Sequence, residues 1–477
     1  MSNAMSQNTF DRVVQLAEDD PVHPYNIGLA RKWLVVTIVS LCSLCVACTS
    51  SIYTTTYDQL FNKFHCSREV ATLGLSLFVF GMGFGPLISG PLSELYGRRI
   101  IFLTSFTCFL IWLVPCALAR NIQTLLIARF FNGFAGSAFL SVAGGTVGDL
   151  FPRHQLAAPM MVSTASPFVG PELGPLVGGF VNQYANWRWT FYTLLSWAAA
   201  MLVFIYVFVP ETHHPAILTQ KAQEIRKQTG NPWPLGPSES ANLAPSQLIL
   251  RSVVRPVMLL TLEPMCLSLC IYSSLLLGIL YLFFGAFQIV FQSVYGFELW
   301  QRGITFISLL VGMILAVLSD PFWRSNYQRL ERDHHAQNGE GSGFYPEWRL
   351  PPAIAGAPLV TMGLFIFLWT TYKSIHCIVP MIGSALFGAG TILVYSGIFT
   401  FLIDAYPSYA ASALAANSFT RSTFAGAFPL FGTQMYERLG LHWASCLLAF
   451  LTLVMLPFPY IFYNYGPQLR KRSRFTS

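Results

Sequence analysis

The chain has 477 residues, of which 54% are hydrophobic and only 10% are charged, and its net charge is +7. Soluble domains carry about 25% charged residues, so this composition excludes an ordinary soluble protein and indicates a membrane protein. The positive charge is spread over many short polar segments, so it gives no support to a nucleic-acid partner. The first four residues resemble a cloning scar before Met5, and the polar start that follows lacks the pattern of a cleaved signal peptide.

Twelve apolar segments follow one another along the chain, each of about 20 residues, the length that a membrane-spanning helix requires. The predicted spans are 33–53, 70–90, 100–119, 122–145, 157–181, 190–209, 265–291, 303–318, 353–371, 378–402, 412–435 and 443–463. Lysine and arginine are concentrated in alternate connecting segments, including both ends of the chain. This bias predicts that both termini lie in the cytosol.

A polar segment rich in proline and serine separates the first six spans from the last six. We predict a cytosolic tail at 1–30, a six-helix bundle at 31–209, a cytosolic linker at 210–257 with an amphipathic helix at 216–227, a second bundle at 258–465 and a basic cytosolic tail at 466–477. The extra residues of the second half are expected in a long polar loop, at 328–346.

Two patterns recur at corresponding places in the two halves. The segment from Ser93 to Arg98 matches the segment from Ser319 to Arg324, with serine, an acid, an aromatic residue and arginine at the same spacing. Asp149 and Asp404 each close a span and precede an aromatic residue and a proline. We infer a duplicated transporter of two pseudo-symmetric six-helix bundles.

The first span contains Cys42, Cys45 and Cys48, whose spacing is similar to that of metal-cluster ligands. No further ligand accompanies them on this apolar helix, so we interpret them as small packing residues. Most other cysteines also lie inside spans, and only Cys66 is expected outside. We therefore predict no metal site and no disulfide framework.

The segment 90–99, after the second span, combines glycines with acidic and basic residues. The glycines allow a tight reversal of the chain, and the charged side chains can pair with one another. The candidate residues are Gly90, Glu94, Gly97, Arg98, Arg99 and Asp149, and the family resemblance described below implies that they form a cytoplasmic gate. The alternative is a positively charged turn whose charges are incidental.

Polar residues also occur inside the fourth span, where lipid exposure would be costly. Arg129, Asn132, Gly133 and Gly136 share one helix face, and that face is expected to point into the bundle. For Arg129 two interpretations stay open: an interaction with a nearby acid that carries protons, or a fixed ion pair between packed helices.

The fifth span contains glycine at every fourth position together with two prolines. This motif consists of Gly170, Pro171, Gly174, Pro175, Gly178 and Gly179. The glycines form a strip that lets another helix approach closely, and Glu172 points away from that strip. Beside Arg129 the Glu172 carboxyl would stay ionised, whereas alone it could exchange a proton or bind cargo. A hydrogen-bonded structural carboxyl is the alternative.

Six polar or aromatic side chains in the spans are candidate cargo contacts: Asn132, Tyr272, Tyr281, Tyr395, Asn417 and Arg421. In the eleventh span, Asn417 and Arg421 are one turn apart and share a face. They could reach polar or anionic cargo, or a gate partner such as Asp404. For Arg421 a stabilising ion pair remains the alternative.

These motifs resemble those of the major facilitator superfamily. Residues 90–99 resemble its signature loop, residues 129–138 its next motif, and residues 170–179 the antiporter motif in the fifth helix of its drug:proton antiporters. Residues 187–189, 210–212 and 346–350 are similar to its fungal multidrug branch. The resemblance implies an all-α fold of twelve transmembrane helices around a central cavity, with proton coupling through Arg129 and Glu172.

The chain departs from this branch at four positions. Leu95 replaces a basic residue of the gate loop, and Asn132 stands where relatives often have aspartate, which removes a possible proton carrier. Gly285 and Gln288 stand where members often have glutamate and proline. The missing acid argues mildly against cationic cargo.

The resemblance implies a proton-coupled secondary transporter that exports drugs, toxins or secondary metabolites by alternating access. Two other functions stay open: a dedicated transporter of one metabolite such as an organic acid, and a membrane receptor without transport. We expect no enzyme activity and no cofactor. We expect a monomer in the plasma membrane, with a small-molecule substrate, protons and lipid as its partners.

Overall fold

A computed structural model describes residues 24–152, 155–229, 245–338, 345–470 and 473. These residues form helices and no β-strand. The first half contains α2 (Leu29–Ile52), η2 (Tyr53–Thr56), α3 (Tyr57–Phe64), α4 (Arg68–Tyr96), α5 (Arg98–Leu118), α6 (Ile122–Gly136), α7 (Ala138–Leu150), α8 (Ala157–Tyr184) and α9 (Trp187–Phe208). After it comes α10 (His214–Thr229), which contains the predicted amphipathic helix.

The second half begins with α12 (Pro245–Leu262) and α13 (Pro264–Tyr295). It continues with α14 (Leu299–Thr305), α15 (Ile307–Leu318), α16 (Asp320–Asn338), η3 (Pro346–Arg349), α17 (Pro351–Trp369), α18 (Ile378–Ala405), η4 (Pro407–Tyr409), α19 (Ala410–Met455) and α20 (Pro457–Arg470). Within α19 the backbone turns at Gly440, whose φ of 75° is outside the helical region. This turn separates the eleventh span from the twelfth.

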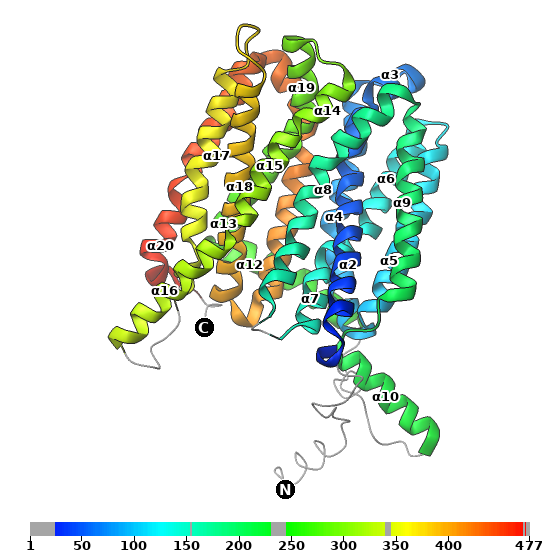
Figure 1. The fold of residues 1–477 in the computed structure, drawn as a ribbon, viewed down its shortest axis with the longest axis vertical. Coiled ribbons are helices and arrows are strands. Elements are labelled where there is room, and N and C mark those ends of the chain that lie inside the picture. The colour runs from blue at the N-terminus through cyan, green and yellow to red at the C-terminus, as the bar shows by residue number, and fades with distance from the viewer. Residues whose placement is uncertain (1–23, 153–154, 230–244, 339–344, 471–472, 474–477) are drawn as a thin grey trace.

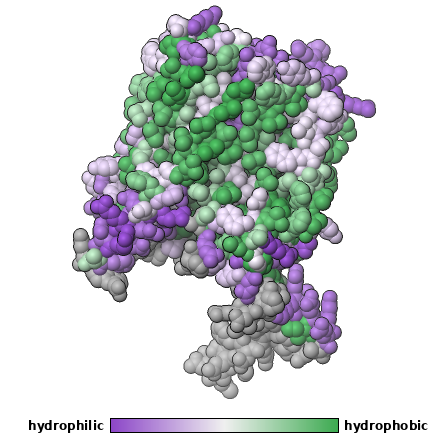
Figure 2. Space-filling view, in the orientation of Figure 1, coloured by the Kyte–Doolittle hydropathy of each residue, from purple (hydrophilic) through white to green (hydrophobic). Residues whose placement is uncertain are grey.

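Twelve crossings of the bundle correspond to the twelve predicted spans. Ten helical stretches among the described residues are long and apolar enough to cross a membrane. The other two crossings are α8 and the part of α19 before Gly440. In Figure 2 hydrophobic side chains cover the middle of the visible face, and hydrophilic side chains gather toward its two ends. This banding is what a protein that spans a bilayer requires.

The two halves stand side by side, and α2 begins at the same end of the bundle at which α20 ends (Figure 1). Helix α10 projects from that end. Helices α8 and α4 of the first half pack against α14 and α19 of the second half, respectively. Sites between the halves therefore lie along these helices.

The glycine strip of α8 lies against α2. A Cβ atom at Gly170 would lie 2.6 Å from the Ala47 side chain, and one at Gly174 would lie 2.0 Å from Ser51 Oγ. A Cβ at Gly178 would lie 2.4 Å from Thr55 Oγ1. Side chains at these positions would push the helices apart, so the spacing of the glycines fixes how closely α2 and α8 pack.

Some boundaries differ from the sequence-based expectation. Helix α4 runs through Gly90 to Tyr96, so the chain reverses at Gly97 alone, where φ is 96°. The polar segment after the eighth span is not an open loop at its start, because it is helical to Asn338. Helix α20 likewise extends to Arg470, into the predicted tail. In α16 the ion pairs Asp320–Arg324 and Arg329–Asp333, each spanning one turn, support the helix. The end of α20 is held by the ion pair between Arg470 and Glu347.

Candidate cargo and proton site

Arg129 of α6 is fully buried and holds the end of α2. Its Nη1 and Nη2 donate to the carbonyls of Thr49 and Ser50 at 2.8 and 3.1 Å, and its Nε donates to the Gly74 carbonyl of α4 at 3.1 Å. Helix α2 changes there to the tighter η2, and the Tyr53 N–H bonds the Ser51 carbonyl. The Thr49 carbonyl is thus left to Arg129, a cation at a helix C-terminus. Arg129 makes a packing contact in this structure, without an acid beside it among the described residues.

Glu172 of α8 is buried, with 1% of its surface exposed, and neither carboxyl oxygen has a hydrogen-bond partner among the described residues. Positions seven residues apart share a helix face, and Gly179 on that face lies against Leu299 and Gly303 of α14. Glu172 therefore faces the second half. An ionised carboxylate in such a place is costly, so this group requires a proton or a ligand that donates to it.

Tyr281 of α13 connects the two halves near the centre of the molecule. Its hydroxyl lies 2.9 Å from Ser50 Oγ of α2, and Glu172, Arg129 and Arg421 all lie close enough to interact with it electrostatically. The Tyr281 hydroxyl thus lies within electrostatic range of three residues that the sequence singled out.

Arg421 of α19 lies among the aromatic rings of Phe168, Tyr395 and Phe399, and these four residues form the Arg421 cluster. Its guanidinium carbon is 5.6 Å from the ring centroid of Phe168, 5.4 Å from that of Tyr395 and 5.1 Å from that of Phe399. Its Nε and Nη1 atoms are buried and form no hydrogen bond with any described residue. The stabilising ion pair that the sequence left open as the alternative for Arg421 is therefore absent among the described residues.

The remaining candidate cargo residues fall into two groups. Asn417 donates to Ser273 Oγ at 2.6 Å, and Tyr395 donates to the Ser273 carbonyl at 3.1 Å, so both lie at the α13 side of the Arg421 cluster. The Tyr272 hydroxyl is buried without a hydrogen-bond partner in the described chain. Asn132 lies elsewhere: it donates to the Phe109 carbonyl of α5 at 2.7 Å.

At the end of the bundle that carries α10, Arg98 joins α5 to α7. Its Nε lies 3.1 Å from Asp149 Oδ2, and its Nη1 donates to Ser93 Oγ at 2.6 Å. The Glu211 carboxylate accepts from the backbone N–H groups of Arg98 and Arg99 at 2.8 and 3.1 Å. Because these amides open α5, Glu211 acts as a charged cap for that helix.

The predicted gate differs from this arrangement in two ways. Glu94 is exposed, and it forms no ion pair with any residue that the structure describes. Gly90 lies inside α4, where a Cβ atom would meet nothing within 4 Å. By contrast, Gly97 is required, because a Cβ there would lie 2.4 Å from a Glu211 oxygen. Arg99 also donates to the Tyr206 carbonyl at 3.0 Å.

The second half has a related but altered set of ion pairs. Asp404 lies 2.7 Å from Arg349, which lies just before α17, whereas Arg98 is the first residue of the corresponding helix α5. Arg324, which matches Arg98 in the sequence repeat, instead pairs with Asp320 one turn away at 2.7 Å. Glu347 accepts two bonds from Arg470, at 2.8 and 2.9 Å.

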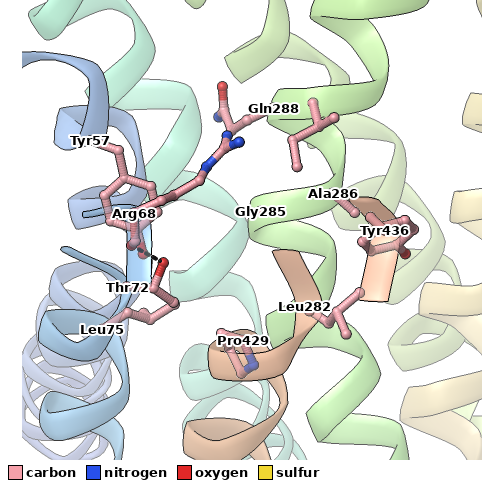
Figure 3. Close-up of a pocket in the computed structure, with 12 residues that line it drawn as sticks. Tyr57, Arg68, Thr72, Leu75, Leu282, Gly285, Ala286, Gln288, Pro429 and Tyr436 are labelled. Atoms are coloured by element: carbon pink, nitrogen blue, oxygen red, sulfur yellow. Dashed lines mark hydrogen bonds between the residues drawn. The ribbon is translucent and has the colours of Figure 1, made fainter. Parts of the chain in front are cut away.

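The opposite end of the molecule contains direct contacts between the halves. Arg302 of α14 lies 3.9 Å from Asp58 of α3. Figure 3 shows a small cavity of about 30 Å³ beside this region, between the residues of α3 and α4 and those of α13 and α19. Gly285 and Gln288 line it, and the Arg68 side chain extends toward Gln288. Two of the four departures from the family pattern, Gly285 and Gln288, thus lie beside this contact between the halves.

Four residues of the candidate sites were missed or underrated in the sequence. Glu211 lies in a segment that resembled the fungal branch, and its place just after the sixth span was the signal for a cap. Phe168 lies four residues before Glu172 and so shares its helix face. Arg302 and Phe399 had no distinguishing pattern, because their contacts come from distant helices.

The architecture defines a secondary transporter with two related six-helix halves. The family model described as Major Facilitator Superfamily matches residues 39–429. Efflux pump atB of Aspergillus terreus is 53% identical over 96% of this chain and 88% of its own. Probable drug/proton antiporter YHK8 of Saccharomyces cerevisiae is 40% identical over 98% of this chain and 90% of its own. The xylose transporter XylE from E. coli, in a partially occluded inward-open conformation, superposes with a TM-score of 0.64 at 15% identity, over 92% of this chain and 98% of its own.

The chain therefore belongs to the Major Facilitator Superfamily. It is a multi-pass membrane transporter and not an enzyme, as the resemblance predicted. The likeness to the xylose transporter concerns the fold alone.

Proposed function

We propose that this transporter exports small organic molecules in exchange for protons. The observation that supports the exchange is Glu172, a buried carboxyl without a hydrogen-bond partner on the face of α8 that meets the second half. An ionisable group inside a membrane bundle is a functional candidate by default. A proton on this carboxyl removes the cost of the buried charge. The carboxyl can therefore hold a proton in one state of the transporter and release it in the other.

The relatives support the direction of transport. One is named an efflux pump and another a probable drug/proton antiporter, and both align over nearly the whole chain. Export with proton entry is driven by the membrane potential, which contributes about 2.3 kcal/mol per charge at 100 mV.

Alternating access requires the two ends of the bundle to open in turn. At the end near α14, Gly179 lies against Gly303, and Asp58 approaches Arg302, so this end must part to release cargo. At the other end we assign the gate to Arg98, Asp149 and Glu211, with Arg99 as a support and Glu94 at the periphery. Gly97 allows the reversal that brings the gate together.

The end with α10 and α16 faces the cytosol in this proposal, which places both termini there and uses the positive-inside bias. The bundles extend over 31–209 and 258–465, and the linker over 210–257. The transporter acts as a monomer in the plasma membrane, in contact with lipid.

Proteoliposomes of the purified chain test this function. A compound panel is offered with and without an imposed pH gradient, and accumulation against the compound's own gradient is measured. The proposal predicts accumulation that collapses when a protonophore is added. Accumulation unaffected by the pH gradient would contradict proton exchange. The Asp333→Asn variant, which alters an exposed acid of α16, controls for effects of mutation and purification on transport.

A further inference from the structure

The Arg421 cluster contains a positive charge that the described protein does not neutralise. Two of the guanidinium nitrogens are buried and unbonded. The electrostatic neighbours of Arg421 are Tyr395, Tyr281 and Cys270, which are neutral groups. A buried cation without a partner is costly, so an anion from outside the protein would be bound strongly here.

The side chains around Arg421 also indicate what kind of molecule would carry the anionic group. Phe168 stacks on Tyr395 with ring centroids 5.1 Å apart, and Tyr395 stacks on Phe399 at 5.6 Å with nearly parallel rings. A flat aromatic molecule can extend such a stack. The Tyr272 hydroxyl, buried and without a partner in the described chain, lies close enough to Tyr395 to interact with it. It offers a further hydrogen bond to a ligand oxygen.

The position of the cluster suits cargo in transit. Phe168 belongs to the first half, whereas Tyr395, Phe399 and Arg421 belong to the second, so the cluster crosses the interface between the halves. Phe168 precedes Glu172 by one helical turn, about 6 Å along α8. Because α8 starts at the end assigned to the cytosol, the cluster lies on the cytosolic side of Glu172.

We propose that the cargo is an aromatic organic anion, whose carboxylate or phenolate pairs with Arg421 and whose ring stacks among Phe168, Tyr395 and Phe399. This inference rests on the proposed export function and names its substrate class. A guanidinium binds a carboxylate along one edge, through Nη2 together with either Nε or Nη1. Nε and Nη1 of Arg421 are both unbonded among the described residues, so each edge offers a free donor. A cation would be repelled by the charge of Arg421 at this site.

Binding to the purified full-length chain tests the proposal directly. The probes are aromatic carboxylates of increasing size, from benzoate to naphthoate and anthracene carboxylate, each with its amide and its aminomethyl counterpart. These sets keep shape nearly constant while the charge changes from negative to neutral to positive. We expect at least one carboxylate to bind ten-fold or more tightly than its amide. Equal affinity within every set, or no carboxylate binding at all, would overturn the proposal.

Arg421 variants locate the binding. Arg421→Gln is expected to abolish the preference for carboxylate over amide, and Arg421→Lys to keep part of it, since the charge remains without the paired donors. The matched control is Arg188→Gln, because Arg188 also lies on an aromatic ring, at 4.6 Å from Trp187, and bonds the Ala119 carbonyl far from the cluster. A preference that survives in Arg421→Gln would refute the assignment. Size-exclusion profiles show that each variant is folded.

A second readout separates this proposal from the export function. Glu172→Gln is expected to bind the carboxylate normally but to lose proton-driven accumulation. Carboxylate binding through Arg421 without any proton-driven transport would support the anion site and contradict the export function. Proton-driven transport of amines or amides, with no carboxylate bound, would support the export function and contradict the anion site. An exported anion should also leave faster when the vesicle interior is made negative, since the potential then favours its exit.

Discussion

Ser50 and Tyr281 join the two halves of the transporter through a hydrogen bond of 2.9 Å between their hydroxyls. The same Ser50 offers its backbone carbonyl to Arg129 at 3.1 Å. Tyr281 in turn lies near both Glu172 and Arg421. This contact between the halves therefore adjoins the buried Arg129 and lies within electrostatic range of the candidate proton carrier and of Arg421.

Removal of the Tyr281 hydroxyl should favour separation of the halves. A net hydrogen bond contributes about 1 kcal/mol, so Tyr281→Phe is expected to shift the equilibrium roughly five-fold toward the state in which the ends of α3 and α14 part. Pulsed electron paramagnetic resonance between spin labels on those ends measures the two populations. Tyr272→Phe is the matched control, because the Tyr272 hydroxyl has no partner among the described residues. Equal shifts in both variants would contradict the role of the contact.

The packing of α8 on α2 should not tolerate a methyl group at Gly174. A Cβ atom there would lie 2.0 Å from Ser51 Oγ and 2.7 Å from the backbone nitrogen of Ile52. Overpacking of this kind costs about 1–3 kcal/mol, so Gly174→Ala should lower the midpoint of thermal unfolding of the detergent-purified protein by several degrees. Gly285→Ala should leave it unchanged or raise it, because nothing lies within 4 Å of that Cβ. A similar fall in the unfolding midpoint of both variants would argue against a role of the glycine strip in the packing of α8 on α2.

Loss of the Glu211 carboxylate should loosen the start of α5. Glu211 accepts four backbone N–H groups, those of Arg98 and Arg99 together with those of Thr212 and His213. A lost cap costs about 1–2 kcal/mol, so Glu211→Ala should speed amide hydrogen exchange in the first turn of α5 about ten-fold. The exposed Glu94 provides the comparison, and Glu94→Ala should leave that exchange unchanged. Faster exchange in Glu94→Ala would restore the gate predicted from the sequence.

The orientation in the membrane can be tested at Cys66, between α3 and α4. In intact cells an impermeant maleimide should label Cys66 from outside, in a variant that lacks Cys377. Burial raises the pKa of the Cys66 thiol, so less of the reactive thiolate is present at neutral pH than for a free cysteine. Labelling should therefore be slow at pH 7 and rise steeply toward pH 9. Labelling that requires permeabilised cells would place the termini outside.

The local features of the fold were predictable because membrane helices leave strong signals in sequence. Length and hydropathy locate the spans, and the period of four at Gly170, Gly174 and Gly178 predicts the face that contacts α2. What the sequence could not specify was the partner of each buried charge. Arg129 was expected beside an acid, but it bonds the carbonyls of Thr49 and Ser50.

The reason is that partners in a bundle come from helices distant in sequence. The carbonyls that Arg129 bonds become available only because α2 tightens into η2. Asp404 likewise pairs with Arg349, although Arg324 has the closer sequence match to Arg98. Sequence periodicity shows which face of a helix is polar, whereas the three-dimensional arrangement decides what that face meets.

The most direct test of the account is proton movement itself. A pH-sensitive dye enclosed in proteoliposomes reports protons carried across the membrane when cargo is added to one side, in wild type and in Glu172→Gln. The account predicts a cargo-dependent pH change in wild type and none in Glu172→Gln, while the variant still exchanges labelled for unlabelled cargo. A cargo-dependent pH change of normal size in Glu172→Gln would contradict the assignment of the proton to this carboxyl.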